Sequence, residues 1–362
     1  MTITQDQVRD ALRSVIDPNT GKDLVSSKSV TSIKLDGANV TVDATLGYPS
    51  RTQREPIRLA IHTCLSALPG IAGLEVNVVS RIDAHSVQRG VKLVPGVKNI
   101  IAVASAKGGV GKSTTATNLA LALADEGATV GILDADIYGP SQPMMLGITG
   151  RPESNDGKSI EPMMGHGIQA ISIGFMIDTD TPMVWRGPMV TQALEQLLNQ
   201  TNWRDVDYLI VDLPPGTGDI QLTLAQKVPV TGAVIVTTPQ DIALIDARKG
   251  LKMFEKVGVP ILGIVENMSM HVCSNCGHQE AIFGTGGAEK MCQDYGTELL
   301  GQLPLDMSIR QRADSGNPTV VADPQSAAAE IYRKIGRRVA VKLAERAKDM
   351  SSKFPNIVVQ NT

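Results

Sequence analysis

Residues 106–114 read Ala106-Lys107-Gly108-Gly109-Val110-Gly111-Lys112-Ser113-Thr114, and they follow the apolar run IIAVAS. Glycines let backbone N–H groups turn toward a polyphosphate, and a helix that begins near Ser113 would add its dipole and its unpaired N–H groups. The Lys112 ammonium suits β- and γ-phosphates, and the Ser113 hydroxyl suits Mg²⁺. The usual pattern has glycine where this chain has Ala106. We therefore predict a loop that binds ATP with Mg²⁺.

Short apolar runs alternate with helical segments on both sides of this loop. The runs are IIAVAS, TVGILDAD, YLIVDLPP, GAVIVTTP and ILGIVENM. Such alternation is typical of an α/β fold with a mostly parallel sheet covered by helices on both faces. Because each run ends in charged, Gly or Pro residues, we expect the functional loops at the carboxyl ends of the strands.

The chain divides, on its sequence patterns, into four parts. Residues 1–86 are predicted to form a small α+β domain, with a helix over residues 4–16, strands VTSIKL and VTVDATL, a helix over residues 54–68 and a strand over residues 74–79. Residues 87–98 contain Gly and Pro without helical period and are predicted to be a linker. Residues 99–350 form the nucleotide-binding domain, whose last helix is expected over residues 325–350, and residues 351–362 are a tail.

The composition of the chain argues against nucleic-acid-binding and membrane-spanning classes of protein. Lys and Arg number 34 against 37 Asp and Glu, and aromatic residues make up 3%, so neither a global positive field nor a base-stacking surface is expected. We therefore do not expect nucleic acid as a partner. The start MTITQDQVRD is polar, and no apolar stretch approaches the length of a membrane span. Four cysteines in 362 residues fit a reducing compartment. We expect a cytoplasmic protein without a membrane partner.

Two further segments carry carboxylates at strand ends. DADIYGPS (residues 134–141) offers Asp134 and Asp136, one for the metal shell and one facing an attacking water. YLIVDLPPGTGD (residues 208–219) ends its strand in Asp212, which can hold the water shell of Mg²⁺. The Pro-Pro-Gly-Thr-Gly turn after Asp212 is expected to present a free backbone N–H to a γ-phosphate.

A Cys-x-x-Cys pair follows the ILGIVENM run, in His271-Val-Cys273-Ser-Asn-Cys276-Gly-His278. Two thiolates at this spacing form a metal half-site. Tetrahedral Zn²⁺ would need two more ligands, for which His271 and His278 are candidates by type, whereas a [4Fe–4S] cluster needs four thiolates, which two copies supply. The spacing alone leaves zinc and an iron–sulfur cluster open. Cys64 and Cys292 lie in predicted helices, where we expect them to be buried small apolar residues.

The motifs KGGVGKST, DADIYGPS and VDLPPGTGD resemble those of the deviant Walker-A ATPases, which include nitrogenase iron protein, ArsA, MinD and ParA. Together with WRGPM (residues 185–189), VTTPQDIAL and the Cys-x-x-Cys, they resemble the Mrp/ApbC branch of iron–sulfur cluster carriers. The resemblance covers about residues 98–338, and residues 1–85 resemble the small domain of iron–sulfur assembly factors.

The resemblance implies a role for each matching residue. Lys107 corresponds to the signature lysine that reaches the phosphates of a partner subunit, Asp136 to the carboxylate that positions the hydrolytic water, and Asp212 to the Walker-B acid. Asn267 corresponds to an asparagine that contacts adenine. Cys273 and Cys276 would then hold a [4Fe–4S] cluster across a homodimer.

The implied function is an ATP-hydrolysing carrier that takes a cluster from an assembly scaffold and passes it to apo-proteins. Two alternatives remain open. One is a ParA/MinD-like positioning ATPase, which would use the basic last helix as its surface and would not need the cysteines. The other is a zinc-binding metallochaperone ATPase, which keeps the cysteines but changes the metal.

Overall fold

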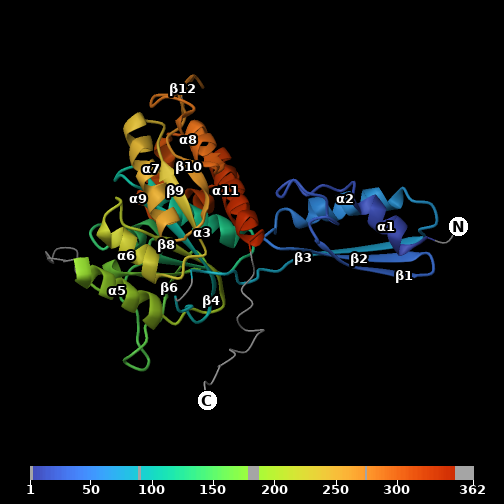
Figure 1. Cartoon of the computed structure of the whole chain (residues 1–362), viewed down its shortest axis with the longest axis horizontal. Coiled ribbons are helices and arrows are strands. Elements are labelled where there is room, and N and C mark those ends of the chain that lie inside the picture. Colours follow the sequence, from blue (N-terminus) through green and yellow to red (C-terminus); the bar gives the residue numbers. More distant parts are fainter. Residues whose placement is uncertain (1–2, 89–90, 178–186, 274, 347–362) are drawn as a thin grey trace, which may run out of the picture. The chain divides into compact units, whose positions relative to one another are not determined.

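The structure is a computed structural model that describes residues 3–88, 91–177, 187–273 and 275–346 (Figure 1). The chain divides into two compact units. One consists of Met1–Ile82 with Asp125–Ala128, and the other of Asp83–Ala124 with the chain from Thr129 onward. The first unit therefore ends before residue 86, where the sequence pattern places the boundary.

The small unit is a three-stranded sheet with two helices. Strand β2 lies between β1 and β3, antiparallel to the first and parallel to the second. Alternate residues of β2 are buried, as expected of a strand with one face against a core. The elements are α1 (Gln5–Leu12), β1 (Val30–Asp36), β2 (Asn39–Leu46), α2 (Arg54–Ser66) and β3 (Gly73–Ser80).

Helix α1 begins at a capping box and is shorter than predicted. The Thr4 hydroxyl accepts the N–H of Gln7, whose side chain accepts the N–H of Thr4. The helix ends at Leu12 although the pattern extends to Ile16, because Ile16 instead forms a β-bridge with Asp23.

The large unit is built on an eight-stranded sheet in the order β13-β10-β9-β4-β8-β5-β7-β6. All neighbouring strands are parallel except β6, which is antiparallel to β7. The strands are β4 (Val97–Ala104), β5 (Val130–Asp134), β6 (Met163–Gly165), β7 (Ile168–Ser172), β8 (Val206–Asp212), β9 (Gly232–Thr237), β10 (Ile261–Glu266) and β13 (Leu299–Gln302). The predicted α/β class with a mostly parallel sheet is confirmed.

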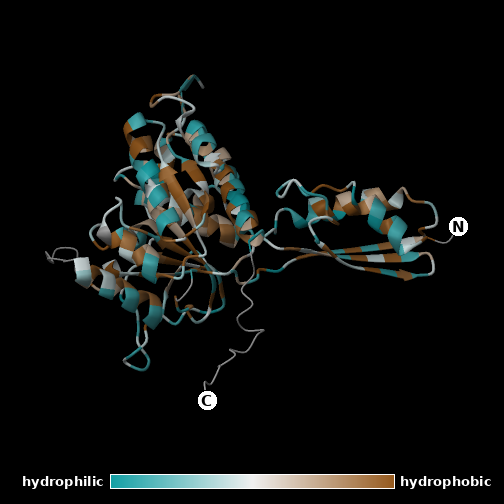
Figure 2. Cartoon of the chain, viewed as in Figure 1, coloured by the Kyte–Doolittle hydropathy of each residue, from teal (hydrophilic) through white to brown (hydrophobic). Residues whose placement is uncertain are grey.

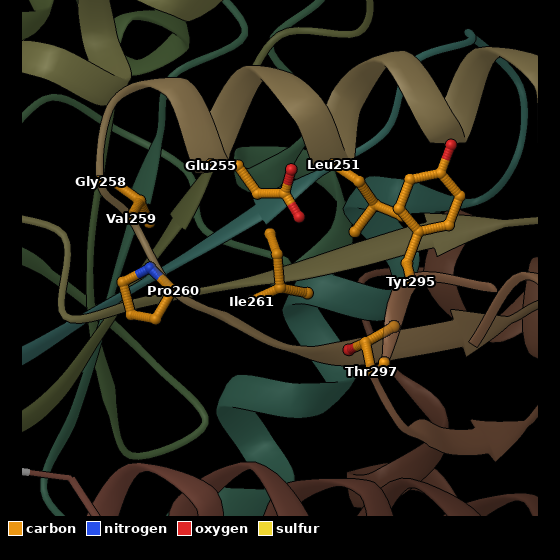
Figure 3. Close-up of a pocket in the computed structure, with 9 residues that line it drawn as sticks. Leu251, Glu255, Gly258, Val259, Pro260, Ile261, Tyr295 and Thr297 are labelled. Carbon is orange, nitrogen blue, oxygen red and sulfur yellow. The ribbon is translucent and has the colours of Figure 1, made fainter. Parts of the chain in front are cut away.

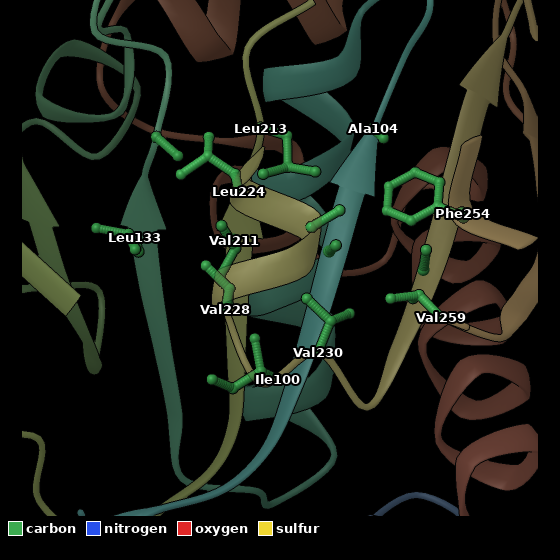
Figure 4. Packing of buried hydrophobic residues seen from close by; sticks show 14 of the residues in the cluster. Ile100, Ala104, Leu133, Val211, Leu213, Leu224, Val228, Val230, Phe254 and Val259 are labelled. Atoms are coloured by element: carbon green, nitrogen blue, oxygen red, sulfur yellow. The ribbon is translucent and has the colours of Figure 1, made fainter. Parts of the chain in front are cut away.

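Helices cover both faces of this sheet (Figures 1 and 2). One face packs against α5 (Gly187–Gln200), α6 (Asp219–Lys227), α7 (Asp241–Lys256) and α8 (Gly287–Tyr295), and this core holds Ile100, Leu133, Val211 and Phe254 (Figure 4). On the other face, α11 (Ala327–Ala344) packs against β13 and β10, and α3 (Lys112–Asp125) lies beside α11. A Cβ added at Gly336 of α11 would lie 3.6 Å from Ala122 of α3, so these two helices touch closely.

The remaining elements are short. They are α4 (Gln142–Met145), η1 (Ile173–Phe175), β11 (His271–Val272), β12 (Gln279–Glu280), α9 (Met307–Asp314) and α10 (Thr319–Ala322). Strands β11 and β12 pair with each other as a separate antiparallel hairpin.

The segment predicted to be a linker packs on the large unit. Gln88 donates a hydrogen bond of 2.9 Å from Nε2 to the carbonyl of Ala225, and Val94 is buried in the core. Strand β4 begins at Val97, within the predicted linker. Polar and turn-forming residues led to the prediction of a linker, but two of the segment's apolar side chains, Val94 and Val97, pack into the core.

Helix α11 is amphipathic as predicted, with Ile335, Val339 and Leu343 fully buried. Its described residues end the helix at Ala344, and the rest of the predicted helix to residue 350 lies mostly outside the described part. In the described chain, no helix combines the length and the apolar character that crossing a membrane requires.

Candidate functional site

The loop of residues 105–111 joins β4 to α3 at the carboxyl end of the sheet. Gly109 and Gly111 have φ values of 80° and 83°, in the left-handed region that glycine adopts without strain. Ala106 is not among the described non-glycine residues with positive φ, so its methyl group fits a position where the usual pattern has glycine. Ser113 and Thr114 lie in the first turn of α3, whose N-terminus faces the loop.

Gly111 is required for a second reason, which is a close approach by Asn267. A Cβ at position 111 would lie 2.1 Å from Nδ2 of Asn267. That amide instead donates a hydrogen bond of 2.9 Å to the carbonyl of Val110. Asn267, which follows β10, therefore holds the backbone of the loop; its predicted contact with adenine stays a prediction.

Lys112 and Asp212 form a buried ion pair at the centre of the site. Nζ of Lys112 lies 2.5 Å from Oδ1 of Asp212, with exposed side-chain fractions of 6% and 0%. The same Nζ donates to the Ser113 hydroxyl over 3.1 Å and lies 4.0 Å from Oδ2 of Asp136. The structure thus brings together Lys112, Ser113, Asp136 and Asp212. Hydroxyl and carboxylate oxygens are the donors that Mg²⁺ prefers, so this set fits the predicted cation.

The two carboxylates of the 134–141 segment have different roles. Asp134 accepts the N–H groups of Asp136, Ser141 and Gln142 and the Ser172 hydroxyl, over 3.0–3.2 Å. Burial, and then the charge of Asp212, raise the pKa of Asp134. Asp134 therefore fixes the loop that follows β5.

Asp136 is the less enclosed carboxylate, because its side chain is 13% exposed and faces Lys112. Burial raises its pKa, while the Lys112 ammonium acts in the opposite direction. A carboxylate of this kind can accept a proton or orient a water molecule.

The turn after Asp212 is anchored to the phosphate loop. Gly216, with φ 111°, donates its N–H to the carbonyl of Ser105 over 2.9 Å. The N–H expected to be free in this turn is therefore not that of Gly216. Because Pro214 and Pro215 have no N–H, Thr217 and Gly218 are the remaining candidates.

Lys107 differs from Lys112 in its surroundings. It is exposed on the loop, and its backbone carbonyl accepts a hydrogen bond of 3.0 Å from the Ser105 hydroxyl. Within the described residues, its ammonium takes part in no ion pair. Lys107 is thus placed at the surface, where a second molecule could approach it.

The cysteine pair lies on the β11–β12 hairpin. Cys273 donates its N–H to the carbonyl of His278, and Gly277, with φ 71°, donates to the carbonyl of Cys273, both over 2.9 Å. Cys273 is half-buried and Cys276 is exposed. N–H groups of Cys276 and Asn275 stabilise the Cys273 thiolate and lower its pKa.

No third ligand joins these two cysteines from within the chain, as far as its described residues extend: they contain no group of three His, Cys, Asp or Glu side chains suited to a metal. Nδ1 of His271 is bonded to the carbonyl of Leu305 at 3.0 Å. Cys292 is buried as predicted, and burial raises its pKa to about 11. Cys64, which was expected to be buried, is only half-buried, and its thiol donates a hydrogen bond of 3.3 Å to the carbonyl of Ala11.

Two polar residues of the site have no counterpart in the sequence prediction. Gln142 and Thr117 form hydrogen bonds beside Asp212. Gln142 directly follows DADIYGPS, and that proximity is its only signal in the sequence. Trp185 and Arg186 of the WRGPM segment lie outside the described residues, and Gly187 begins α5.

A pocket of about 340 Å³ lies elsewhere on the large unit (Figure 3). It is lined by residues at the carboxyl ends of α7 and α8 and at the amino end of β10, including Glu255, Tyr295 and Pro260. None of the predicted site residues lines it. The phosphate loop, by contrast, lies at the carboxyl ends of the strands.

Both parts of the chain match known protein families. Residues 96–340 match the family described as NUBPL iron-transfer P-loop NTPases, and residues 5–78 match iron-sulfur cluster assembly proteins. The chain is 59% identical over 277 residues to the iron-sulfur cluster carrier protein of Pseudomonas fragi, covering 76% of this chain and 96% of that protein. With the carrier protein of Haemophilus influenzae it shares 49% identity over 340 residues, or 94% and 92% of the two chains.

A solved structure is also similar to this chain. The nucleotide-binding protein of Archaeoglobus fulgidus, in complex with ADP, aligns with a TM-score of 0.57 and 36% identity, covering 65% of this chain and 92% of that one. On these matches, the chain belongs to the NUBPL iron-transfer family of P-loop NTPases.

Proposed function

We propose that this protein is a cytoplasmic, ATP-hydrolysing carrier that holds a [4Fe–4S] cluster between two copies of the chain. The cluster would come from an assembly scaffold and pass to apo-proteins. The observation that carries the proposal is the short segment that joins Asn267, which holds the phosphate loop, to Cys273 on the hairpin.

The number of thiolates supports a homodimer. A [4Fe–4S] cluster takes four thiolates, and the hairpin offers Cys273 and Cys276. A two-fold axis through the cluster would supply the other pair from the second copy. The exposed Lys107 supports the same assembly, because a cation from the partner can offset charge at a transferring phosphoryl group.

The residues of the nucleotide site would divide the work of hydrolysis. Lys112 would exchange its contact with Asp212 for the β- and γ-phosphates, while Ser113 and Asp212 hold Mg²⁺, which offsets phosphate charge. Asp136 would orient the attacking water, and its raised pKa makes it a better proton acceptor than an ordinary aspartate. The loops around Gly216 and Asp134 would report the nucleotide state.

The positioning-ATPase alternative finds less support in α11. Arg333 and Arg337 are 9% and 5% exposed and both bond to Glu330, so these cations are not on a free basic surface. Lys342 pairs with Glu298. Because these charges are used within the large unit, the helix suits packing on the sheet better than binding to DNA or a membrane surface.

Anaerobic reconstitution with iron and sulfide tests the proposal. We expect the wild-type protein to gain the visible absorption of a [4Fe–4S] cluster, with roughly four iron atoms per pair of chains. Cys273→Ser and Cys276→Ser should each lose the cluster. Cys64→Ser, a half-buried thiol of the small unit, is the matched control and should load normally.

The same samples distinguish the iron–sulfur cluster carrier from the zinc-binding alternative. A wild-type protein that binds stoichiometric zinc but no cluster would favour the metallochaperone reading. Equal loading of all three cysteine variants would remove the hairpin as the cluster site. Sedimentation of the loaded protein should give a dimer, and a loaded monomer would contradict the shared cluster.

A further inference from the structure

Gln142 is buried beside the Lys112–Asp212 pair, with no exposed surface. Its Oε1 accepts a hydrogen bond of 2.7 Å from the Thr117 hydroxyl of α3. Its Nε2 donates to Oδ2 of Asp212 over 2.9 Å and to the carbonyl of Ser113 over 3.4 Å. The side chain therefore connects the end of β8, the first turns of α3 and the start of α4.

The backbone of Gln142 is fixed as firmly as its side chain. Its N–H donates to Oδ2 of Asp134 over 3.1 Å, next to the N–H of Ser141 on the same oxygen. Asp134 is itself completely buried at the end of β5. A movement of the loop that follows β5 would therefore also move Gln142 relative to Asp212.

Each carboxylate oxygen of Asp212 has a different hydrogen-bond partner. Oδ2 is bonded to Gln142 and Oδ1 to Lys112. An amide N–H satisfies a buried carboxylate oxygen without adding a charge, whereas a second cation would compete with Mg²⁺ for the carboxylate. Once Lys112 turns to the phosphates, Oδ1 becomes the oxygen available to the water shell of the cation.

We propose that Gln142 is a positioning residue that orients the Asp212 carboxylate toward Mg²⁺ and links this orientation to the loop after β5. The inference rests on the proposed use of Mg²⁺-nucleotide at this site. It adds a residue that senses the position of the loop and acts on the cation through Asp212, not through contact with the nucleotide.

The test measures the Mg²⁺ requirement separately from nucleotide binding. A fluorescent ADP analogue is titrated into the full-length protein at a series of buffered Mg²⁺ concentrations and also in EDTA. Gln142→Met keeps the size of the side chain and removes the amide. We expect the Mg²⁺ concentration at half-effect to rise about tenfold, as for the loss of one hydrogen bond to a charged group, with affinity in EDTA within about twofold of wild type.

Gln169→Met is the matched control for the loss of a buried glutamine. Gln169 lies in β7 and exchanges two hydrogen bonds of 2.9 Å with the backbone of Arg204. We expect this variant to lose stability to urea but to keep the wild-type Mg²⁺ midpoint. A merely structural role for Gln142 predicts the same behaviour for both variants.

An unchanged Mg²⁺ midpoint in Gln142→Met, or an equal shift in Gln169→Met, overturns the positioning role. If Gln142→Met does not fold, Thr117→Val removes the hydroxyl that holds Oε1 and should raise the midpoint about threefold; no shift there also overturns the inference. The titration of the wild-type protein tests the proposed function separately. If nucleotide binding by the wild type does not depend on Mg²⁺, the proposed function itself is contradicted.

Discussion

The side-chain amide of Asn267 donates a hydrogen bond of 2.9 Å to the carbonyl of Val110, which ties the phosphate loop to the end of β10. The chain continues from Asn267 through Met268 to the cysteine hairpin. Met268 has φ 59°, a conformation that a non-glycine residue keeps only where its surroundings impose it. Ser269 donates to the carbonyl of Leu303 over 3.0 Å, which fixes the next residue. The segment between the phosphate loop and Cys273 is therefore held at each of its first three residues.

Asn267→Ala should weaken nucleotide binding by roughly fivefold. The substitution removes one neutral hydrogen bond to the loop and leaves the carbonyl of Val110 without this partner. Titration with a fluorescent ADP analogue measures the effect. Asn199→Ala is the control, because Asn199 makes a comparable bond of 2.9 Å to the carbonyl of Glu195 on the exposed side of α5. Equal affinities for wild type and Asn267→Ala would show that the loop does not depend on this bond.

Gly111→Ala and Gly108→Ala should differ sharply. At position 111 a methyl group meets both a φ of 83° and Nδ2 of Asn267, so we expect lost nucleotide binding and a free energy of unfolding lower by about 2 kcal/mol. At position 108 no atom lies within 4 Å of an added Cβ, and no left-handed φ opposes it. Urea unfolding should place Gly108→Ala within about 0.5 kcal/mol of wild type. Similar losses in both variants would contradict the geometry described for the loop.

Lys107→Ala should lower ATP turnover by about 10²-fold or more while nucleotide binding survives. The exposed ammonium is expected to act on the phosphates of a second copy, as an arginine finger does. Lys112→Ala should instead lose binding as well, because it removes the ammonium proposed to contact the β- and γ-phosphates. It also leaves the buried Asp212 carboxylate without its cation. Phosphate release and nucleotide titration measure the two properties. Unchanged turnover in Lys107→Ala would remove this role.

Mixing two inactive variants tests whether Lys107 acts across the dimer. In a mixed dimer of Lys107→Ala and Asp136→Asn, the first subunit keeps Asp136 and can receive Lys107 from the second. We therefore expect the mixture to recover part of the turnover, although each variant alone is inactive. If the lysine acts within its own subunit, both sites of the mixed dimer are defective and no activity returns.

The parallel sheet was predictable because each strand near the site is a continuous apolar run with a polar end. Strands such as β8 are buried on both faces, and this pattern is visible in YLIVD without any knowledge of neighbours. Strand β7 was harder to predict, since IQAIS is short and Gln169 interrupts its apolar character. The glutamine is satisfied by the backbone of Arg204, a contact that exists only after folding.

The site was predictable wherever its chemistry resides in one short segment. Lys112 and Ser113 are neighbours in the chain, and Cys273 and Cys276 share one turn. Gln142 was missed because its role needs three segments to meet, and the sequence does not show that Thr117 and Asp212 lie on either side of it. Resemblance suggests Asn267 as an adenine contact, but its bond to Val110 depends on the folded loop.

The Cys273 thiol should react with iodoacetamide at lower pH than an ordinary thiol. Its pKa is lowered first by the N–H of Cys276 and then by that of Asn275, both of which stabilise the thiolate. Because the thiolate is the nucleophile, its alkylation should rise with pH through a midpoint below the ordinary value of about 8.5. Mass spectrometry of the metal-free protein follows each cysteine separately. Cys292, with a pKa raised to about 11 by burial, should stay unmodified below pH 9 or so.

Two variants test which group lowers the pKa of the Cys273 thiol. Cys276→Ser keeps the backbone N–H that acts first on Cys273, so most of the lowered midpoint should persist. Gly277→Val places a β-branched side chain at φ 71°, which should open the turn and return the midpoint to that of a free thiol. If Cys276→Ser alone restored the ordinary midpoint, the neighbouring thiol and not the turn would be the cause. The hairpin would then position the Cys273 thiol without lowering its pKa.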